Sequence, residues 1–281
     1  MLDKSPIESE FTEVLSWLPP LARRSGLAIL DIYHQATKDV QGVSGTLVSR
    51  KADDSPLTRA DLAAHQMIVE GLRVHRPTIP IVSEESYEPE QMLELGDCFW
   101  LVDPLDGTKE FLAATGEFTV NIALISGGAS ILGVVYQPVT GDLFWGGRQF
   151  GAYRQVGEHH AHPIHVNPAP SRPWQVMASR SHLGTKTQSL IERMGDVDLV
   201  QAGSSLKFCR IATGEADFYP RLGFTSQWDT AAAQAVLEGA GGYVIDEQGN
   251  SLSYGQPDII NPHFLATALP YQAVKSWWHS S

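Results

Sequence analysis

The segment WLVDPLDGTKEF, residues 100–111, is an apolar run that ends in two carboxylates, a glycine and a hydroxyl. Pro104 fixes its own φ, lacks an N–H and biases Asp103 toward an extended backbone, so we expect a strand that turns at this point. Such a turn lets the carboxylates of Asp103 and Asp106 and the carbonyl of Leu105 face one point. Oxygen-only ligands are what Mg²⁺ requires, at about 2.0–2.1 Å. The segment therefore predicts a strand that ends at a hard-cation site.

A phosphate site is predicted beside the cation site. Gly107 permits close backbone approach, and residues 108–111 have the pattern of a first helical turn whose unpaired N–H groups can hold a phosphate. The alternative is an ordinary β-turn, because Asp, Pro and Gly are common turn formers.

Composition limits the classes of function. With 281 residues and 43% hydrophobic content, the chain can build one large domain or two closely packed halves. The formal net charge of −12 argues against a nucleic-acid-binding surface. A phosphorylated substrate remains compatible with this charge, because bound Mg²⁺ inverts the local field.

Several features favour a cytoplasmic protein. Cys98 and Cys209 form no C-x-x-C pair and are typical of small core residues in a reducing compartment. Residues 1–11 resemble neither a signal peptide nor a transit peptide, and no run of about eighteen apolar residues predicts a spanning helix. We expect Trp277 and Trp278 to pack within the protein and not to contact a membrane, since no basic amphipathic helix accompanies them. Peripheral association with the inner membrane, and the choice between monomer and homodimer, stay open.

Periodicity predicts an α/β (α+β) fold in two halves. In residues 1–167 we expect a helix over about 8–35 with a break or new start at Pro19-Pro20, a second helix from Thr58, and strands that form an antiparallel meander. In residues 168–281 strands and helices alternate. The predicted strands are 79–83, 99–102, 119–125, 131–136, 143–145, 176–179, 199–202, 218–220 and 243–245, and the later helices are 188–194, 206–213 and 230–238.

Three further segments carry acidic groups, and each has an ordinary alternative. Glu84 and Glu85 follow a short apolar strand, where glutamates are usually solvated. Asp229 heads an Ala-rich helix, where Asp is a good N-cap. Thr58 and Asp61 have the spacing of a capping box.

Taken in this order, the segments resemble the Mg²⁺-dependent, lithium-sensitive phosphatase superfamily that contains inositol monophosphatase and fructose-1,6-bisphosphatase. Within it, the chain is similar to the 3′(2′),5′-bisphosphate nucleotidases of the CysQ type. The motifs that carry this likeness are KADDSPLT at 51–58, DGTKEF at 106–111 and GSSLKF at 203–208. Inositol monophosphatases typically have Asn in place of the pair Lys109-Glu110.

The resemblance implies a layered αβαβα sandwich of the sugar-phosphatase type, with the active site between the two halves. It also implies two or three Mg²⁺ ions per site. One ion would bind Glu84, Asp103 and the Leu105 carbonyl, and a second would bind Asp103, Asp106 and Asp229, with Asp103 bridging. Glu85 is the less certain glutamate.

The implied reaction is hydrolysis of adenosine 3′,5′-bisphosphate to AMP and phosphate, in the service of sulfur assimilation. A water would be the nucleophile, activated by Thr108 with Asp61, and the phosphate would rest on the backbone N–H groups of Gly107 and Thr108. The alternative substrates are inositol phosphates and related sugar phosphates.

A nucleoside bisphosphate carries a second phosphate that is not cleaved, so the site needs further donors. The segment that begins the predicted helix near residue 205 and one later arginine supply candidates. A solvated surface charge is the alternative for the basic residues. The candidates are Lys109, Ser204, Ser205, Lys207 and Arg221.

Other interpretations fit the sequence less well. In aspartyl-phosphate phosphatases one residue separates the two carboxylates, whereas two residues, one of them proline, separate Asp103 from Asp106. A non-catalytic scaffold would lack a ligand or activator, and none of the implied residues is missing. A zinc site is disfavoured because the histidines at 159, 160, 162 and 165 match no zinc spacing.

Overall fold

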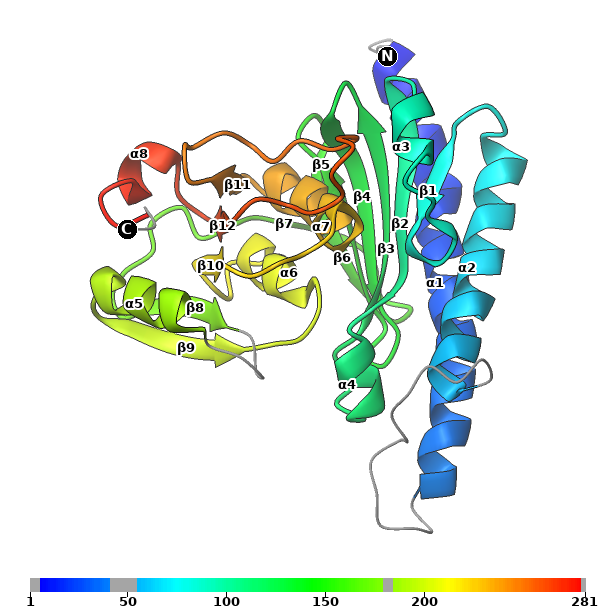
Figure 1. Ribbon diagram of the computed structural model, residues 1–281, viewed down its shortest axis with the longest axis horizontal. Helices are drawn as coiled ribbons and strands as arrows, with labels where there is room; N and C mark the ends of the chain where they lie inside the picture. The colour runs from blue at the N-terminus through cyan, green and yellow to red at the C-terminus, as the bar shows by residue number, and fades with distance from the viewer. Residues whose placement is uncertain (1–5, 41–54, 179–183, 279–281) are drawn as a thin grey trace.

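A computed structural model of the chain describes residues 6–40, 55–178 and 184–278. The quoted residues 51–54 lie outside this part. Elements alternate in five layers (Figure 1). The helices are α1 (Pro6–Val40), α2 (Pro56–His75), η1 (Glu84–Ser86), α3 (Gln91–Glu94), α4 (Thr108–Leu112), α5 (Thr185–Met194), α6 (Leu206–Ala212), α7 (Gln227–Gly239) and α8 (Tyr271–Val274).

Two sheets form the second and fourth layers. The larger has the order β1-β2-β3-β4-β5-β6-β7, in which β1 pairs parallel to β2 and the remaining pairs are antiparallel. Its strands are β1 (Ile81–Ser83), β2 (Cys98–Asp106), β3 (Thr119–Ser126), β4 (Ala129–Gln137), β5 (Asp142–Gly147), β6 (Gly151–Val156) and β7 (His162–Ile164). The predicted meander is confirmed.

The smaller sheet has the order β11-β12-β10-β8-β9. Its strands are β8 (Trp174–Ala178), β9 (Val197–Gln201), β10 (Phe218–Arg221), β11 (Tyr243–Asp246) and β12 (Phe264–Thr267). The sheets separate between β7 and β8, close to the predicted boundary at 167/168. That boundary stays a prediction as a division into domains.

Three apolar clusters hold the layers together. One joins α1 and α2 to the outer face of the large sheet, one joins α6 and α7 to both sheets, and one joins α5 and α8 to the outer face of the small sheet. The central helix α7 approaches β4 so closely that a Cβ on Gly133 would lie 2.0 Å from the Ala232 carbonyl oxygen. This packing fixes the start of α7, where Asp229 lies, over the sheet that carries Asp103. The implied αβαβα sandwich is confirmed.

The prediction of a helix break at Pro19-Pro20 is wrong. Both prolines lie inside one continuous helix, α1. Leu18, Leu21 and Ile29 on this helix are buried against the large sheet and α2. The free energy of burying this apolar face outweighs the cost of the backbone hydrogen bonds that the prolines remove.

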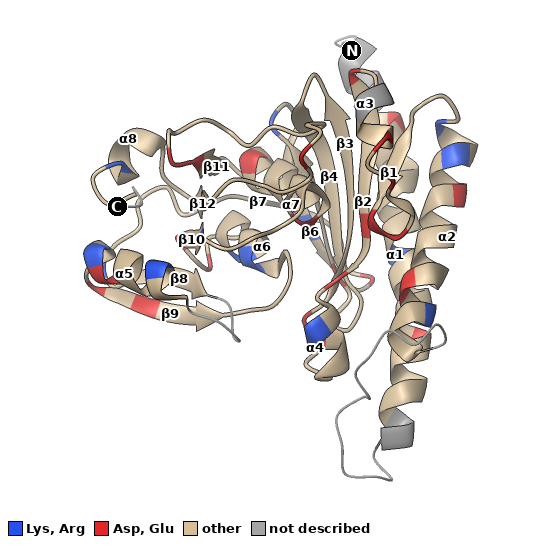
Figure 2. Cartoon of the chain, viewed as in Figure 1, with Lys and Arg blue, Asp and Glu red and all other residues tan. Residues whose placement is uncertain are grey.

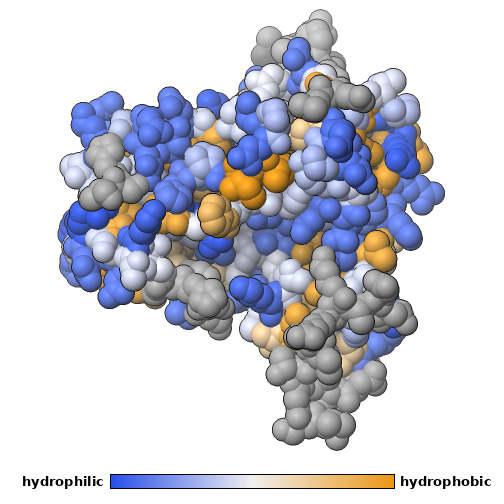
Figure 3. Space-filling model, viewed as in Figure 1, coloured by the Kyte–Doolittle hydropathy of each residue, from blue (hydrophilic) through white to orange (hydrophobic). Residues whose placement is uncertain are grey.

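The structure also describes the C-terminal tryptophans, the two cysteines and the surface. Trp277 and Trp278 are buried, and the Trp278 indole N–H donates to the Asp246 carbonyl 2.8 Å away, so the packing prediction holds. Both cysteines are free thiols. In the described ranges, no helix has the length and apolar content needed to cross a membrane. On the face shown in Figure 3, hydrophilic residues cover most of the surface.

Candidate metal and phosphate site

The apolar strand β2 ends at the predicted turn. Its pairing with β3 is regular through Asp103, opposite Asn121, and then shifts register before Asp106, opposite Thr119. The N–H of Leu105 donates to Asp103 Oδ1 at 3.0 Å, a contact that closes the turn around Pro104. The shift allows Asp103 and Asp106, three residues apart, to reach the same side of the sheet.

Carboxylates from three elements converge beside this turn. Glu84 begins η1 directly after β1, Asp103 lies in β2 and Asp229 lies in the first turn of α7. One oxygen from each of these three side chains lies within 4.8 Å of the others. Figure 2 shows acidic residues at η1 and along the lower part of β2. Carboxylate oxygens at this spacing repel one another unless a cation lies between them, so the donor set fits a hard divalent ion.

The electrostatics of the cluster record this repulsion. The pKa of Asp103, whose side chain is 1% exposed, is raised well above its usual value by burial first and then by the charges of Glu84, Asp106, Asp229 and Asp61. Burial and Asp106 likewise raise the pKa of Asp229 to about 7, although the Ser226 N–H bonded to its carboxylate acts in the opposite direction. Both shifts have the direction expected for carboxyl groups that lack a counter-charge.

Asp106 is held from the other side by the loop before α6. Its Oδ2 accepts the Ser204 hydroxyl at 2.5 Å and the Ser205 backbone N–H at 2.7 Å. Ser204 has a φ of +53°, an uncommon conformation outside glycine. With Oδ2 occupied by two donors, the second oxygen of Asp106 remains for a metal.

The implied catalytic pair lies at the same end of the sheet. Asp61 is buried in α2 and its charge acts on Asp103. Thr108 begins α4, which contacts α2. Gly107, at a φ of +99°, precedes α4, and a Cβ there would lie 3.1 Å from the Glu117 carbonyl oxygen. The alternative interpretation of Thr58 and Asp61 as a capping box does not hold, because Ser55 caps α2 by accepting the Thr58 N–H.

The basic candidates differ in their surroundings. Lys109 is exposed. Lys207 is buried, and its ammonium donates to the carbonyl oxygens of Ser204 at 2.6 Å and Ala202 at 3.3 Å. Burial lowers the pKa of Lys207 to about 8. Arg221, at the end of β10, donates to the Phe224 carbonyl at 2.9 Å. Lys207 therefore lies beneath the loop that holds Asp106.

Sequence reasoning missed two residues of this site. Thr119 and Asn121 are fully buried on β3, where they lie opposite Asp106 and Asp103 of β2. Both contact the Ser205 hydroxyl, at 2.8 Å each. Their signal in the sequence is two polar residues spaced by two within an otherwise apolar strand, because such residues share a face of the sheet.

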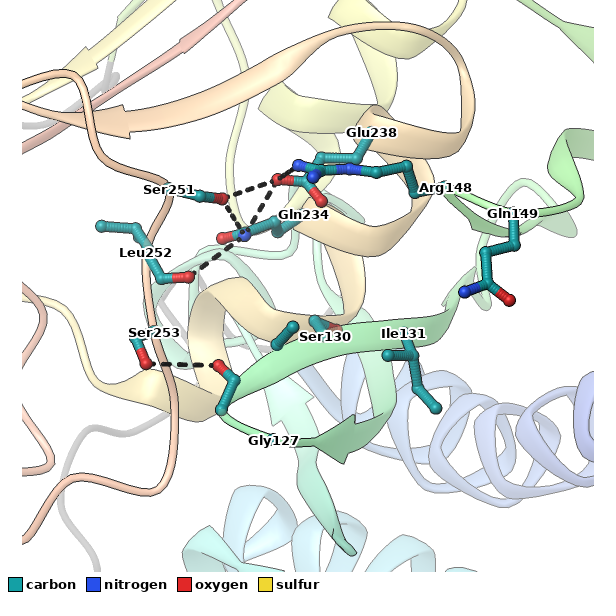
Figure 4. Close-up of a pocket in the computed structure, with 12 residues that line it drawn as sticks. Gly127, Ser130, Ile131, Arg148, Gln149, Gln234, Glu238, Ser251, Leu252 and Ser253 are labelled. Atoms are coloured by element: carbon teal, nitrogen blue, oxygen red, sulfur yellow. Dashed lines mark hydrogen bonds and ion pairs between the residues drawn. The ribbon is translucent and has the colours of Figure 1, made fainter. Parts of the chain in front are cut away.

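A cavity lies away from the carboxylates (Figure 4). It is lined by the β3–β4 turn, the β5–β6 turn, the end of α7 and residues 251–253. Its charged residues, Arg148 and Glu238, pair with each other at 3.1 Å. The four histidines at 159–165 are exposed, and in the part of the chain that the structure describes, the carboxylates are the cluster with metal-binding spacing.

A layered sandwich with this carboxylate cluster defines a metal-dependent phosphatase. The sequence profile of the inositol monophosphatase family matches residues 10–277. The 3′(2′),5′-bisphosphate nucleotidase CysQ of Salmonella typhimurium is 43% identical over 248 residues, which cover 88% of this chain and 96% of that protein. The chain belongs to the inositol monophosphatase family.

Solved structures agree with this assignment. CysQ from Bacteroides thetaiotaomicron, a bacterial member of the family, matches with a TM-score of 0.75 and 35% identity, covering 88% of this chain and 94% of that one. An inositol monophosphatase from Zymomonas mobilis matches in fold with a TM-score of 0.72 and 22% identity, covering 98% and 99%.

Proposed function

We propose that the protein is a Mg²⁺-dependent 3′(2′),5′-bisphosphate nucleotidase that hydrolyses adenosine 3′,5′-bisphosphate to AMP and phosphate and serves sulfur assimilation. The observation that carries the phosphatase assignment is the convergence of Glu84, Asp103 and Asp229 on one point beside Asp106. The similarity to CysQ proteins over most of both chains supports the substrate class. We further propose a cytoplasmic location, for which two free thiols are suited.

We propose the following distribution of the ions over this donor set. Glu84, Asp103 and the Leu105 carbonyl would hold one Mg²⁺, while Asp103, Asp106 and Asp229 would hold a second, within a complement of two or three ions. Bound divalent ions stabilise charge on phosphoryl oxygens and lower the pKa of coordinated water. The two donors on Asp106 Oδ2 keep its other oxygen oriented for this role.

Thr108 and Asp61 would activate the attacking water. The Thr108 hydroxyl oxygen would accept a hydrogen bond from the water, and the Thr108 hydroxyl proton would move toward the buried Asp61 carboxylate. The Gly107 and Thr108 backbone N–H groups would bind the phosphate that is cleaved, since the positive φ of Gly107 brings this backbone close to the carboxylates.

The uncleaved phosphate would bind near the start of α6. Ser204 and Ser205 supply hydroxyl and backbone groups there, and Lys207 adds a positive charge beneath the loop. The exposed Lys109 and the partly buried Arg221 would supply further donors. Because charge-assisted hydrogen bonds are roughly twice as strong as neutral ones, these residues would favour a bisphosphate over a monophosphate.

A phosphate-release panel tests the proposal. The purified protein with Mg²⁺ is offered adenosine 3′,5′-bisphosphate, 3′-phosphoadenylyl sulfate, inositol 1-phosphate and fructose 1,6-bisphosphate. We expect the highest kcat/KM for an adenosine bisphosphate and no release in EDTA. A preference for inositol 1-phosphate would refute the nucleotidase assignment and leave the metal site standing, whereas release in EDTA would refute the metal site.

A further inference from the structure

Asn121 combines burial with an unpartnered donor. Its side chain, on β3, is 1% exposed. Its carboxamide oxygen accepts the Ser205 hydroxyl at 2.8 Å and lies 3.3 Å from the Thr119 hydroxyl oxygen. Its Nδ2 is buried and has no hydrogen-bond partner in the structure.

In the structure the carboxamide oxygen of Asn121, and not its nitrogen, faces the neighbouring hydroxyls. Ser204 donates its one hydroxyl proton to Asp106 Oδ2, so the 2.5 Å contact between Ser204 and Thr119 requires Thr119 to be the donor. The proton of Ser205 is then left for the Asn121 oxygen. With its oxygen used in this way, the carboxamide directs its two N–H bonds elsewhere.

The direction of those N–H bonds is set by strand register. Asn121 lies directly opposite Asp103 across the β2–β3 ladder. Side chains of directly opposed residues share a face of the sheet, with Cβ atoms about 4.5–5.5 Å apart. Buried side-chain donors are nearly always bonded, so a free one beside a metal-binding carboxylate calls for an acceptor of its own.

We propose that Asn121 is a positioning residue of the metal site. In the metal-loaded protein its carboxamide N–H donates to the Asp103 carboxylate, while its oxygen accepts the hydroxyl of Ser205, whose backbone N–H donates to Asp106. One side chain thereby fixes the orientation of two aspartates that share an ion. The inference rests on the proposed metal site, and it adds a residue that none of the sequence motifs includes.

Asparagine-selective ¹⁵N labelling tests this directly in the wild-type protein, because the chain contains four asparagines. Mg²⁺ should move the Asn121 carboxamide proton signal downfield and slow its exchange with water. The other three serve as internal controls and should not respond, because they already have acceptors: Asn167 donates to Asp217, Asn250 to Asp246 and Asn261 to Ser226. Loss of one signal in Asn121→Leu assigns it.

The outcomes separate the inference from the proposed function. If calorimetry records Mg²⁺ binding while the Asn121 signal stays in place, the role of Asn121 is refuted and the metal site stands. If calorimetry records no Mg²⁺ binding, the metal site is refuted and the inference with it.

A variant gives a second, independent readout. Asn121→Leu keeps the branched shape of the side chain but removes its donor and its acceptor, and we expect a ten- to hundredfold weaker Mg²⁺ affinity by calorimetry, the range for a hydrogen bond to a charged group. We expect kcat to fall while KM for the nucleotide stays near its wild-type value. The matched control is Ser130→Ala, which removes a buried hydrogen bond to the Ala231 carbonyl at the far end of the sheet. Equal losses of Tm in both variants, with Mg²⁺ affinity unchanged in both, would make Asn121 a purely structural residue.

Discussion

Replacement of Asp229 by Asn separates the stability of the metal-free fold from metal binding. The Asp229 carboxylate accepts the Ser226 N–H at 2.9 Å, and an Asn oxygen can accept the same bond, so the start of α7 should be preserved. What the substitution removes is a buried carboxyl whose pKa burial and Asp106 raise from 3.8 to about 7. The variant also loses a proposed metal ligand.

The sign of the effect follows from proton linkage. In the unfolded chain this carboxyl ionises near its ordinary pKa, whereas in the metal-free fold it stays protonated until about pH 7. Its contribution to stability is therefore complete below about pH 4 and is lost as the pH rises through 7. At about 1.4 kcal/mol for each pKa unit, the wild-type protein loses about 4 kcal/mol by pH 8.

Asp229→Asn should recover most of this loss. Removal of a negative charge near a helix N-terminus costs about 0.3–1 kcal/mol, which leaves a net gain of about 3 kcal/mol at pH 8. For a chain of this size, that gain raises Tm by about 6 °C at roughly 2 °C for each kcal/mol. At pH 4 the variant and the wild type should melt together.

Thermal melts by circular dichroism in EDTA at pH 4, 6 and 8 measure the effect. Saturating Mg²⁺ should stabilise the wild type at pH 8 and do so much less in Asp229→Asn, which should also lose turnover. A variant that melts no higher than wild type at pH 8 in EDTA would refute the electrostatic reasoning. So would a gain of equal size at pH 4, because it could not arise from ionisation.

Three further substitutions test the proposed site. Asp103→Asn should abolish turnover and leave the circular dichroism spectrum unchanged, and near-normal turnover at saturating Mg²⁺ would contradict shared use of Asp103 by two ions. Thr108→Ala should lower kcat far more than it raises KM, since water activation belongs to the transition state. In the wild-type protein, a single turnover in ¹⁸O-water should label phosphate directly, whereas label in an aspartate would support an aspartyl-phosphate route. Lys207→Ala should lower kcat/KM for adenosine 3′,5′-bisphosphate about ten- to hundredfold more than for 3′-AMP, with the exposed Lys109→Ala as the comparison; equal losses on both substrates would mean that Lys207 only supports the loop that holds Asp106.

The parts of the fold that follow local rules could be predicted from the sequence. The apolar run before Pro104, the short strand before Glu84 and the Ala-rich helix after Asp229 each carry their own signal, and all three elements are present. Strand β12 (Phe264–Thr267) was missed, because its sequence has no alternating pattern. It is buried in the small sheet between β10 and β11, where tertiary pairing decides its conformation.

The sequence predicts which side chains a site contains more readily than it predicts their conformation and contacts. The GSSLKF motif placed Ser204, Ser205 and Lys207 near the start of a helix, which is where they lie. The sequence carried no sign that Ser204 adopts a positive φ, or that Lys207 points beneath the loop toward two carbonyl oxygens. Ser204 itself contacts Asp106 and Thr119, residues 85 or more positions away, and such contacts have no local sequence signal.

The charge of the protein sets an order of binding events. A chain with a net charge of −12, whose site gathers Glu84, Asp103, Asp106 and Asp229, repels a bisphosphate before any ion arrives. The buried ammonium of Lys207 offsets this acidity only in part, because burial lowers its pKa to about 8. Divalent ions in the cluster would neutralise the carboxylates and reverse the local field, so the same acidic residues that exclude polyanions from the empty site make the loaded site selective for them. We therefore expect divalent ions to bind before the nucleotide or together with it, and the acidity of the chain as a whole is compatible with a highly anionic substrate.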